Sequence, residues 1–149
     1  MNSERGIKMK KISLKKGRII LGEGTQGPAL ISRKAFMFAH GVNPKSGEVI
    51  DKKSDVYKKN IKDKVFIFPN GKGSTTGSMW FLETIRLGNA PKAIINEKSE
   101  MIIVTGAILG ELIYKKKITI IDNINFDQIE EINEGDLVII KNNEIFIKR

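Results

Sequence analysis

The segment from residue 64 to residue 97, "KVFIFPNGKGSTTGSMWFLETIRLGNAPKAIINE", most constrains the fold. The apolar run at 64–69 indicates a buried strand, and residues 92–97 indicate another. Between them, apolar residues recur at helical spacing over 78–87, and Gly88 stands where a helix would end. A strand, a glycine-rich loop, a helix and a strand within about thirty residues predict a βαβ unit.

The segments on either side predict further strands. Residues 18–24 indicate a strand that ends at glycines, and residues 28–33 indicate a second strand after the turn "TQGP". Residues 43–51 indicate a turn followed by a short strand, with Pro44 and Gly47 as the turn residues.

The last third is predicted to be more β-like, with one ambiguous segment. β-Branched residues favour a strand at 101–104, and residues 107–114 favour a helix. Residues 117–122 indicate a strand, and residues 135–149 a closing hairpin that turns at Asn142 and Asn143. The predicted fold class is mixed α/β, with a barrel-like mixed sheet and flanking helices.

Length and composition limit the domain organisation and the location. The chain has 149 residues, which predicts one domain over residues 1–149 with a core of its own. Residues 1–10 are predicted to be a flexible or weakly ordered extension. No apolar run approaches the roughly 20 residues of a membrane helix. Since the N-terminus also lacks the apolar segment of a signal peptide, we predict a cytoplasmic protein without a membrane partner.

The titratable residues limit the possible partners and metals. The chain has no cysteine and a single histidine, His40, so we predict no metal site. The net charge of +9 fits a nucleic-acid surface, an acidic protein partner or a solvated lysine-rich face. The lysines are scattered and no aromatic residues interleave with them, so we predict no nucleic-acid partner.

The glycine-rich loop "GKGSTTGS", residues 71–78, matches neither common nucleotide motif. Lys72 precedes its glycine, whereas a P-loop requires the order Gly-Lys-Ser/Thr, and the glycine spacing is one residue too long for a dinucleotide fingerprint. Two interpretations stay open. The loop and the following helix could bind an anion through free N–H groups and the helix dipole. Alternatively, a hydroxyl caps the helix and the glycines only turn the chain.

Three ordered blocks carry a family resemblance. They are "GEGTQGPALIS", "FMFAHGVNPKSGEVID" and "FPNGKGSTTGSMWFLETIRLGNAPKAII". Their order and spacing resemble the small subunit of the aconitase X family, over roughly residues 17–122. The resemblance implies a swivelling β/β/α domain that closes over a large catalytic subunit, in a heterodimer or larger assembly.

The same resemblance implies a dehydratase. Archaeal members convert phosphomevalonate, a phosphorylated hydroxy acid, to trans-anhydromevalonate phosphate, and bacterial relatives include cis-3-hydroxyproline dehydratases. The archaeal enzymes hold an iron–sulfur cluster (4Fe–4S) through cysteines of the large subunit, so this chain is expected to bind no cofactor. Two alternatives are the small subunit of another aconitase X dehydratase, such as a cis-3-hydroxyproline dehydratase, and a stand-alone anion-binding module.

The resemblance also implies roles in the loop. The family's catalytic base corresponds to Ser74. The implied substrate-binding residues are Lys72, Gly73, Thr75, Thr76, Gly77 and Ser78. A serine can act as a base only if its alkoxide is stabilised, and the candidate donors are the backbone N–H groups of residues 75–78.

Several positions depart from the family pattern. Lys72 stands where arginine is usual, which removes bidentate geometry, and Thr75 replaces a common serine but keeps a hydroxyl. Asn43 stands where aspartate is usual. For the second block, a tight turn and contact with the active site both remain possible, and His40 within it is a poor metal ligand on its own.

Overall fold

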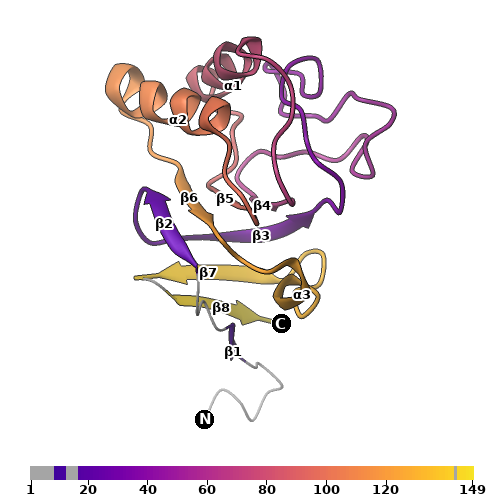
Figure 1. Ribbon diagram of the computed structural model, residues 1–149, viewed down its shortest axis with the longest axis vertical. Coiled ribbons are helices and arrows are strands. Elements are labelled where there is room, and N and C mark those ends of the chain that lie inside the picture. The colour runs from indigo at the N-terminus through magenta and orange to yellow at the C-terminus, as the bar shows by residue number, and fades with distance from the viewer. Residues whose placement is uncertain (1–8, 13–16, 143) are drawn as a thin grey trace.

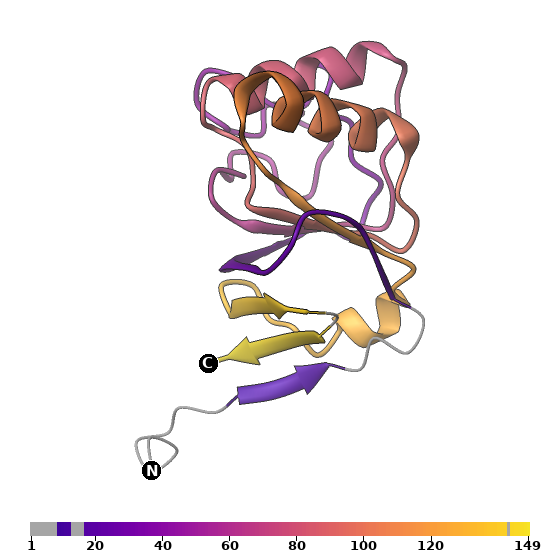
Figure 2. The same ribbon diagram turned by 90° about the vertical axis from the view of Figure 1, so that its left-hand side faces the viewer.

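The computed structural model describes residues 9–12, 17–142 and 144–149 and has three layers (Figure 1, Figure 2). Helices α1 (Thr76–Arg86) and α2 (Met101–Tyr114) cover one face of a central sheet. Strands β1 (Met9–Ile12), β7 (Leu137–Lys141) and β8 (Glu144–Lys148) form the layer on the other side, beside the short helix α3 (Phe126–Ile129). This is the β/β/α arrangement that the resemblance implies.

The strands form one folded sheet in the order β1-β8-β7-β3-β4-β5-β6-β2. The remaining bounds are β2 (Arg18–Leu21), β3 (Thr25–Ile31), β4 (Val65–Ile67), β5 (Ala93–Ile95) and β6 (Thr119–Asp122). The first half of β3 pairs antiparallel with β7, and its second half pairs parallel with β4. Because β3 belongs to both halves, the sheet folds over on itself, and β1 and β2 are its two edges.

The predicted βαβ unit is confirmed. Strands β4 and β5 pair in parallel, with Phe66 opposite Ile94, and α1 connects them. The strands expected at 18–24, 28–33, 64–69, 92–97 and 117–122 all occur with shifted ends. The closing hairpin is also confirmed as β7 and β8, although its turn residue Asn143 lies outside the described residues.

Two predictions need correction. The strand expected at 101–104 is wrong, because those residues form the first turn of α2. Ile103, Val104 and Ala107 are buried on one side of that helix, and packing there overrides the strand preference of β-branched residues. The short strand expected within 43–51 is reduced to isolated bridges, Val42 with Val49 and Glu48 with Asn60.

The expected extension over residues 1–10 lies mainly outside the described residues. Within it, Met9 and Lys10 belong to β1, which pairs antiparallel with β8. Within the part of the chain that the structure describes, no helix is long and apolar enough to cross a bilayer.

The central strands are buried on both faces. Phe66, Ile94 and Ile120 point toward the helices and join one apolar cluster with Phe81 of α1. Their neighbours along the same strands join a second cluster with β7 and β8; these are Val65, Ile67, Ala93, Ile95 and Ile121. Alternation along a strand sends successive side chains to opposite faces, so a continuous apolar run serves two cores.

The two helices pack closely through glycines of α2. A β-carbon added at Gly106 would lie 2.9 Å from the backbone oxygen of Ser78, and one at Gly110 would lie 2.9 Å from Cγ2 of Ile85. The Ser78 hydroxyl donates to the Ile102 carbonyl at 2.8 Å. The start of α1 is therefore fixed against the start of α2.

We predict that Gly106→Leu lowers the free energy of unfolding by about 1–3 kcal/mol, because the added side chain forces the helices apart. Thr105→Leu is the control, since Thr105 is exposed on the same helix and should change stability by less than about 0.5 kcal/mol. Chemical denaturation of both variants measures the difference. Equal stabilities would show that the helix contact is not close.

Candidate functional site

The glycine-rich loop leaves the carboxyl end of β4 and leads into α1. It is held by the segment that follows β3, because the Phe36 N–H donates to the Asn70 carbonyl and the Lys72 N–H donates to the Phe36 carbonyl, both at 3.0 Å. Loops at the carboxyl ends of parallel strands are the usual binding positions in α/β sheets. The loop therefore lies where a ligand site is expected.

The loop glycines make room for the chain's own side chains. A β-carbon at Gly71 would lie 2.6 Å from Cδ1 of Ile103, and one at Gly77 would lie 3.1 Å from Cγ2 of Ile102. Gly73 has a φ of +115° and would place a β-carbon 3.0 Å from Cγ of Met37. The glycines thus allow α2 and Met37 to pack against the loop, in addition to any approach by a ligand.

The start of α1 leaves some N–H groups free and uses others. The Gly77 N–H donates to the Ser74 carbonyl at 2.9 Å, and the Ser78 N–H donates to the Thr75 carbonyl at 3.0 Å. The expectation that residues 77 and 78 offer free donors is therefore wrong. Within the described residues, the N–H groups of Ser74, Thr75 and Thr76 have no acceptor. These three are the available donors at the positive end of the helix dipole.

The capping alternative is not realised at the cap position. Thr75 occupies that position with helical angles and makes no side-chain cap hydrogen bond. Its hydroxyl, like those of its two neighbours Ser74 and Thr76, is on an exposed residue. The hydroxyls of these three residues are therefore available to a ligand.

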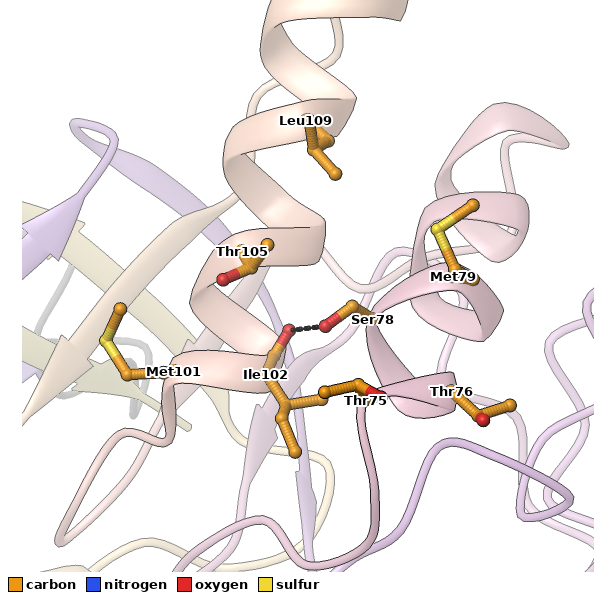
Figure 3. Close-up of a pocket in the computed structure, with 8 residues that line it drawn as sticks. All are labelled: Thr75, Thr76, Ser78, Met79, Met101, Ile102, Thr105 and Leu109. Atoms are coloured by element: carbon orange, nitrogen blue, oxygen red, sulfur yellow. Dashed lines mark hydrogen bonds between the residues drawn. The ribbon is translucent and has the colours of Figure 1, made fainter.

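The predicted site residues fall into two groups. One group is exposed, and it comprises Lys72, Gly73, Ser74, Thr75 and Thr76. Gly77 and Ser78 are buried, and the Ser78 hydroxyl is already bonded to Ile102 (Figure 3). In the portion that the structure describes, neither the Ser74 hydroxyl nor the Lys72 ammonium has a protein partner. Ser74 thus offers a free hydroxyl and Lys72 a free ammonium group.

A groove lies between the start of α1 and the part of α2 from Met101 to Leu109 (Figure 3). It has a volume of about 520 Å³ and is lined by Thr75, Thr76, Ser78, Met79, Met101, Ile102, Thr105 and Leu109. The contribution of α2 was not predicted from the sequence. A strand at 101–104 followed by a helix does not place Met101, Thr105 and Leu109 on one side of a single helix. A helical reading of the whole segment would have found it.

The second sequence block forms a turn that packs against α1. The Asn43 side chain accepts from the Lys45 N–H at 3.0 Å, and Gly47 has a φ of +82°. The Trp80 indole donates to the Val42 carbonyl at 2.7 Å, and its ring lies 4.5 Å from that of His40. The tight-turn interpretation is confirmed, and the block supports the helix that carries the loop.

The residues present do not fit an iron–sulfur cluster or another metal centre. The chain has no cysteine, so it offers no thiolate. Among residues 9–12, 17–142 and 144–149, no group of three or more histidine, aspartate or glutamate side chains could hold a metal ion. The glycine-rich loop itself offers hydroxyls, one ammonium group and backbone N–H groups.

Known proteins resemble this chain over most of its length. The family profile described as "Aconitase X swivel domain" matches residues 14–148. The phosphomevalonate dehydratase small subunit of Methanocella arvoryzae is 42% identical over 84% of this chain and 90% of its own. That of Methanocaldococcus jannaschii is 40% identical over 89% of this chain and 95% of its own.

A solved structure agrees with the fold. The crystal structure of Thermococcus kodakaraensis aconitase X in its holo form matches with a TM-score of 0.78 and 35% identity. The match covers 89% of this chain and 95% of that chain. The similarity therefore extends over most of the fold.

We predict that Gly73→Ala costs about 1–3 kcal/mol of unfolding free energy, because a positive φ and the Met37 contact both oppose a β-carbon. Gly135→Ala is the control, since Gly135 also has a positive φ, of +86°, with no atom within 4 Å of an added β-carbon. Met37→Ala should recover part of the loss in the Gly73→Ala background. Without such recovery in denaturation experiments, the contact does not constrain the loop.

Proposed function

The chain belongs to the aconitase X swivel domain family, and we propose that it is the small subunit of a phosphomevalonate dehydratase. The observation that carries this proposal is the agreement in identity and length with small subunits of that name, 40% over 89% of this chain in one case. The proposed enzyme is a cytoplasmic hydro-lyase that works only as a heteromeric complex.

In the proposed reaction, phosphomevalonate loses water. The base takes a proton from the carbon next to the carboxylate, and the hydroxyl leaves from the neighbouring carbon. The electron pair of the broken C–H bond becomes part of the new double bond of trans-anhydromevalonate phosphate. We assign the proton removal to Ser74, whose hydroxyl is exposed and has no partner in the described part of the chain.

A serine needs help to act as a base. The free N–H groups of Ser74, Thr75 and Thr76 lie at the start of α1, and the helix dipole adds a positive field there. Preorganised donors of this kind lower the free energy of an oxyanion without reorganising during the reaction. The Lys72 ammonium, in the same loop, adds a positive charge. We propose that these groups together make the Ser74 alkoxide accessible.

We divide the other loop residues between binding and positioning. Lys72, Gly73, Thr75 and Thr76 are exposed, and we propose that they contact the anionic substrate. Gly77 and Ser78 are buried within the helix contact, so we assign them the positioning of the turn. This revises the expectation that all six neighbours of Ser74 bind substrate.

The rest of the active site belongs to the partner. We propose a large subunit that binds most of the substrate and carries the iron–sulfur cluster, since this chain has no cysteine to hold one. When bound there, the cluster supplies Lewis acidity toward the leaving hydroxyl. The small subunit contributes the base and its donors.

Ser74→Ala in the assembled enzyme should lower kcat by about 10²–10⁴-fold, as expected when a general base is lost. Ser54→Ala is the control, because the Ser54 hydroxyl only accepts a local N–H from Val56. Steady-state kinetics on phosphomevalonate measure both, and size-exclusion chromatography checks assembly. Full activity of assembled Ser74→Ala would disprove the base assignment.

The isolated chain should show no dehydratase activity, because hydroxyls and one lysine cannot by themselves hold the substrate and assist loss of its hydroxyl. Adding purified large subunit should restore turnover in proportion to complex formed. Detection of the anhydro product by mass spectrometry is the measurement. Turnover by the chain alone at the rate of the complex would contradict the divided active site.

A further inference from the structure

The outer side of the helix layer is apolar. Met79 of α1 and Met101, Ile108 and Leu112 of α2 are 61%, 74%, 40% and 64% exposed. We call these four residues the apolar helix face. They account for half of the eight large hydrophobic residues that are exposed in the described chain, so exposed apolar surface is concentrated on this layer.

Helix α2 lacks the polar outer side of an ordinary surface helix. Its sequence "MIIVTGAILGELIY" contains one charged residue, Glu111. Ile103, Val104 and Ala107 pack inward, whereas Met101, Ile108 and Leu112 repeat on the outside at spacings of seven and four. A helix that is apolar all round is normally buried on all sides. We therefore expect another protein surface to cover the outer side of α2.

The apolar helix face is continuous with the loop that carries Ser74. Met79 and Met101 line the same groove as Thr75 and Thr76, the two residues that follow Ser74 (Figure 3). The groove therefore begins one residue after Ser74, whose own side chain is exposed. The loop with the candidate base therefore adjoins the apolar helix face.

We propose that the apolar helix face is the surface on which the large subunit docks. This inference rests on the proposed function, which requires a second chain at the loop. The groove receives apolar side chains of the partner, and docking buries Met101 and Leu112 while it places the partner's substrate-binding groups opposite Ser74.

Charged residues near the apolar helix face indicate the charge of the partner's surface. Lys115 and Lys116 at the end of α2, and Lys72 in the loop, have no acidic partner in the described ranges. Arg86 is instead paired with Glu83 at 2.6 Å, and this pairing lowers the pKa of the Glu83 carboxyl. The complementary surface is therefore apolar with an acidic rim.

The same charges argue against a second copy as the occupant. A symmetric dimer through this face would bring together two chains that each carry a net charge of +9. It would also place unpaired lysines of both copies at one interface, which is unfavourable without acidic partners. A partner of different composition fits the surface better.

Binding measurements with matched variants test the docking surface. Met101→Asp and Leu112→Asp should weaken binding of the purified large subunit by about tenfold to several hundredfold, as at central interface positions. Met9→Asp is the control, because Met9 is 58% exposed on β1, in the layer opposite the helices (Figure 2). Isothermal titration calorimetry gives the affinities, and thermal unfolding of each isolated variant verifies its fold.

A second measurement, by crosslinking, introduces no charge into the proposed interface. Since the chain has no cysteine, Thr105→Cys and Met9→Cys each create a single attachment point for a benzophenone label. Illumination of the complex should crosslink the label at position 105 to the large subunit and leave the label at position 9 unreacted with it.

The outcomes separate the docking surface from the proposed function. Wild-type affinity of both Asp variants, or crosslinking from position 9 alone, would overturn the docking surface. Equal weakening by Met9→Asp would overturn it too, as would a homodimer of the chain that only the helix-face variants dissociate. If the complex forms through this face but does not dehydrate phosphomevalonate, the docking surface stands and the proposed function fails.

Discussion

Burial of the central strands on both faces is the constraint on which the rest of the structure depends. Phe66, Ile94 and Ile120 require a cover on one side, and their neighbours along β4, β5 and β6 require one on the other. The helices satisfy the first requirement and the folded-over strands β7 and β8 satisfy the second. Because β3 pairs with both halves, a single continuous sheet provides its own second layer.

This arrangement places the candidate site. Parallel strands end at a common edge, and the loop after β4 leaves that edge under the start of α2. Close packing at Gly77 and Gly106, together with the bond from Ser78 to Ile102, holds the start of α1. The buried half of the loop thereby packs against α2, while the half with Ser74 is exposed. Such a division suits the role proposed for Ser74, a base that acts on a substrate held by another chain.

Local pattern and tertiary contacts contributed differently to what could be predicted. The βαβ unit over 64–97 could be predicted from periodicity. In that segment, the local preference of each strand and of the helix agrees with its environment in the folded protein. The prediction of a strand at 101–104 was wrong. β-Branched residues prefer strands in isolation, but packing against α1 stabilises a helix there. The prediction of free N–H groups at residues 77 and 78 was wrong, because both groups donate to carbonyls within the turn. Whether an N–H stays free depends on the geometry of the turn, which the residue pattern does not describe.

By itself, the sequence determined the apolar runs, the breakpoints at glycine and proline, the lack of thiolates and the order of hydroxyls in the loop. These depend on residue type and spacing alone. Only the tertiary structure decided which hydroxyls face outward, which N–H groups stay free and that α2 shares the groove with the loop. The physical reason is that exposure and hydrogen-bond satisfaction arise from contacts between segments distant in the chain, here the loop at 71–78 and the helix at 101–114.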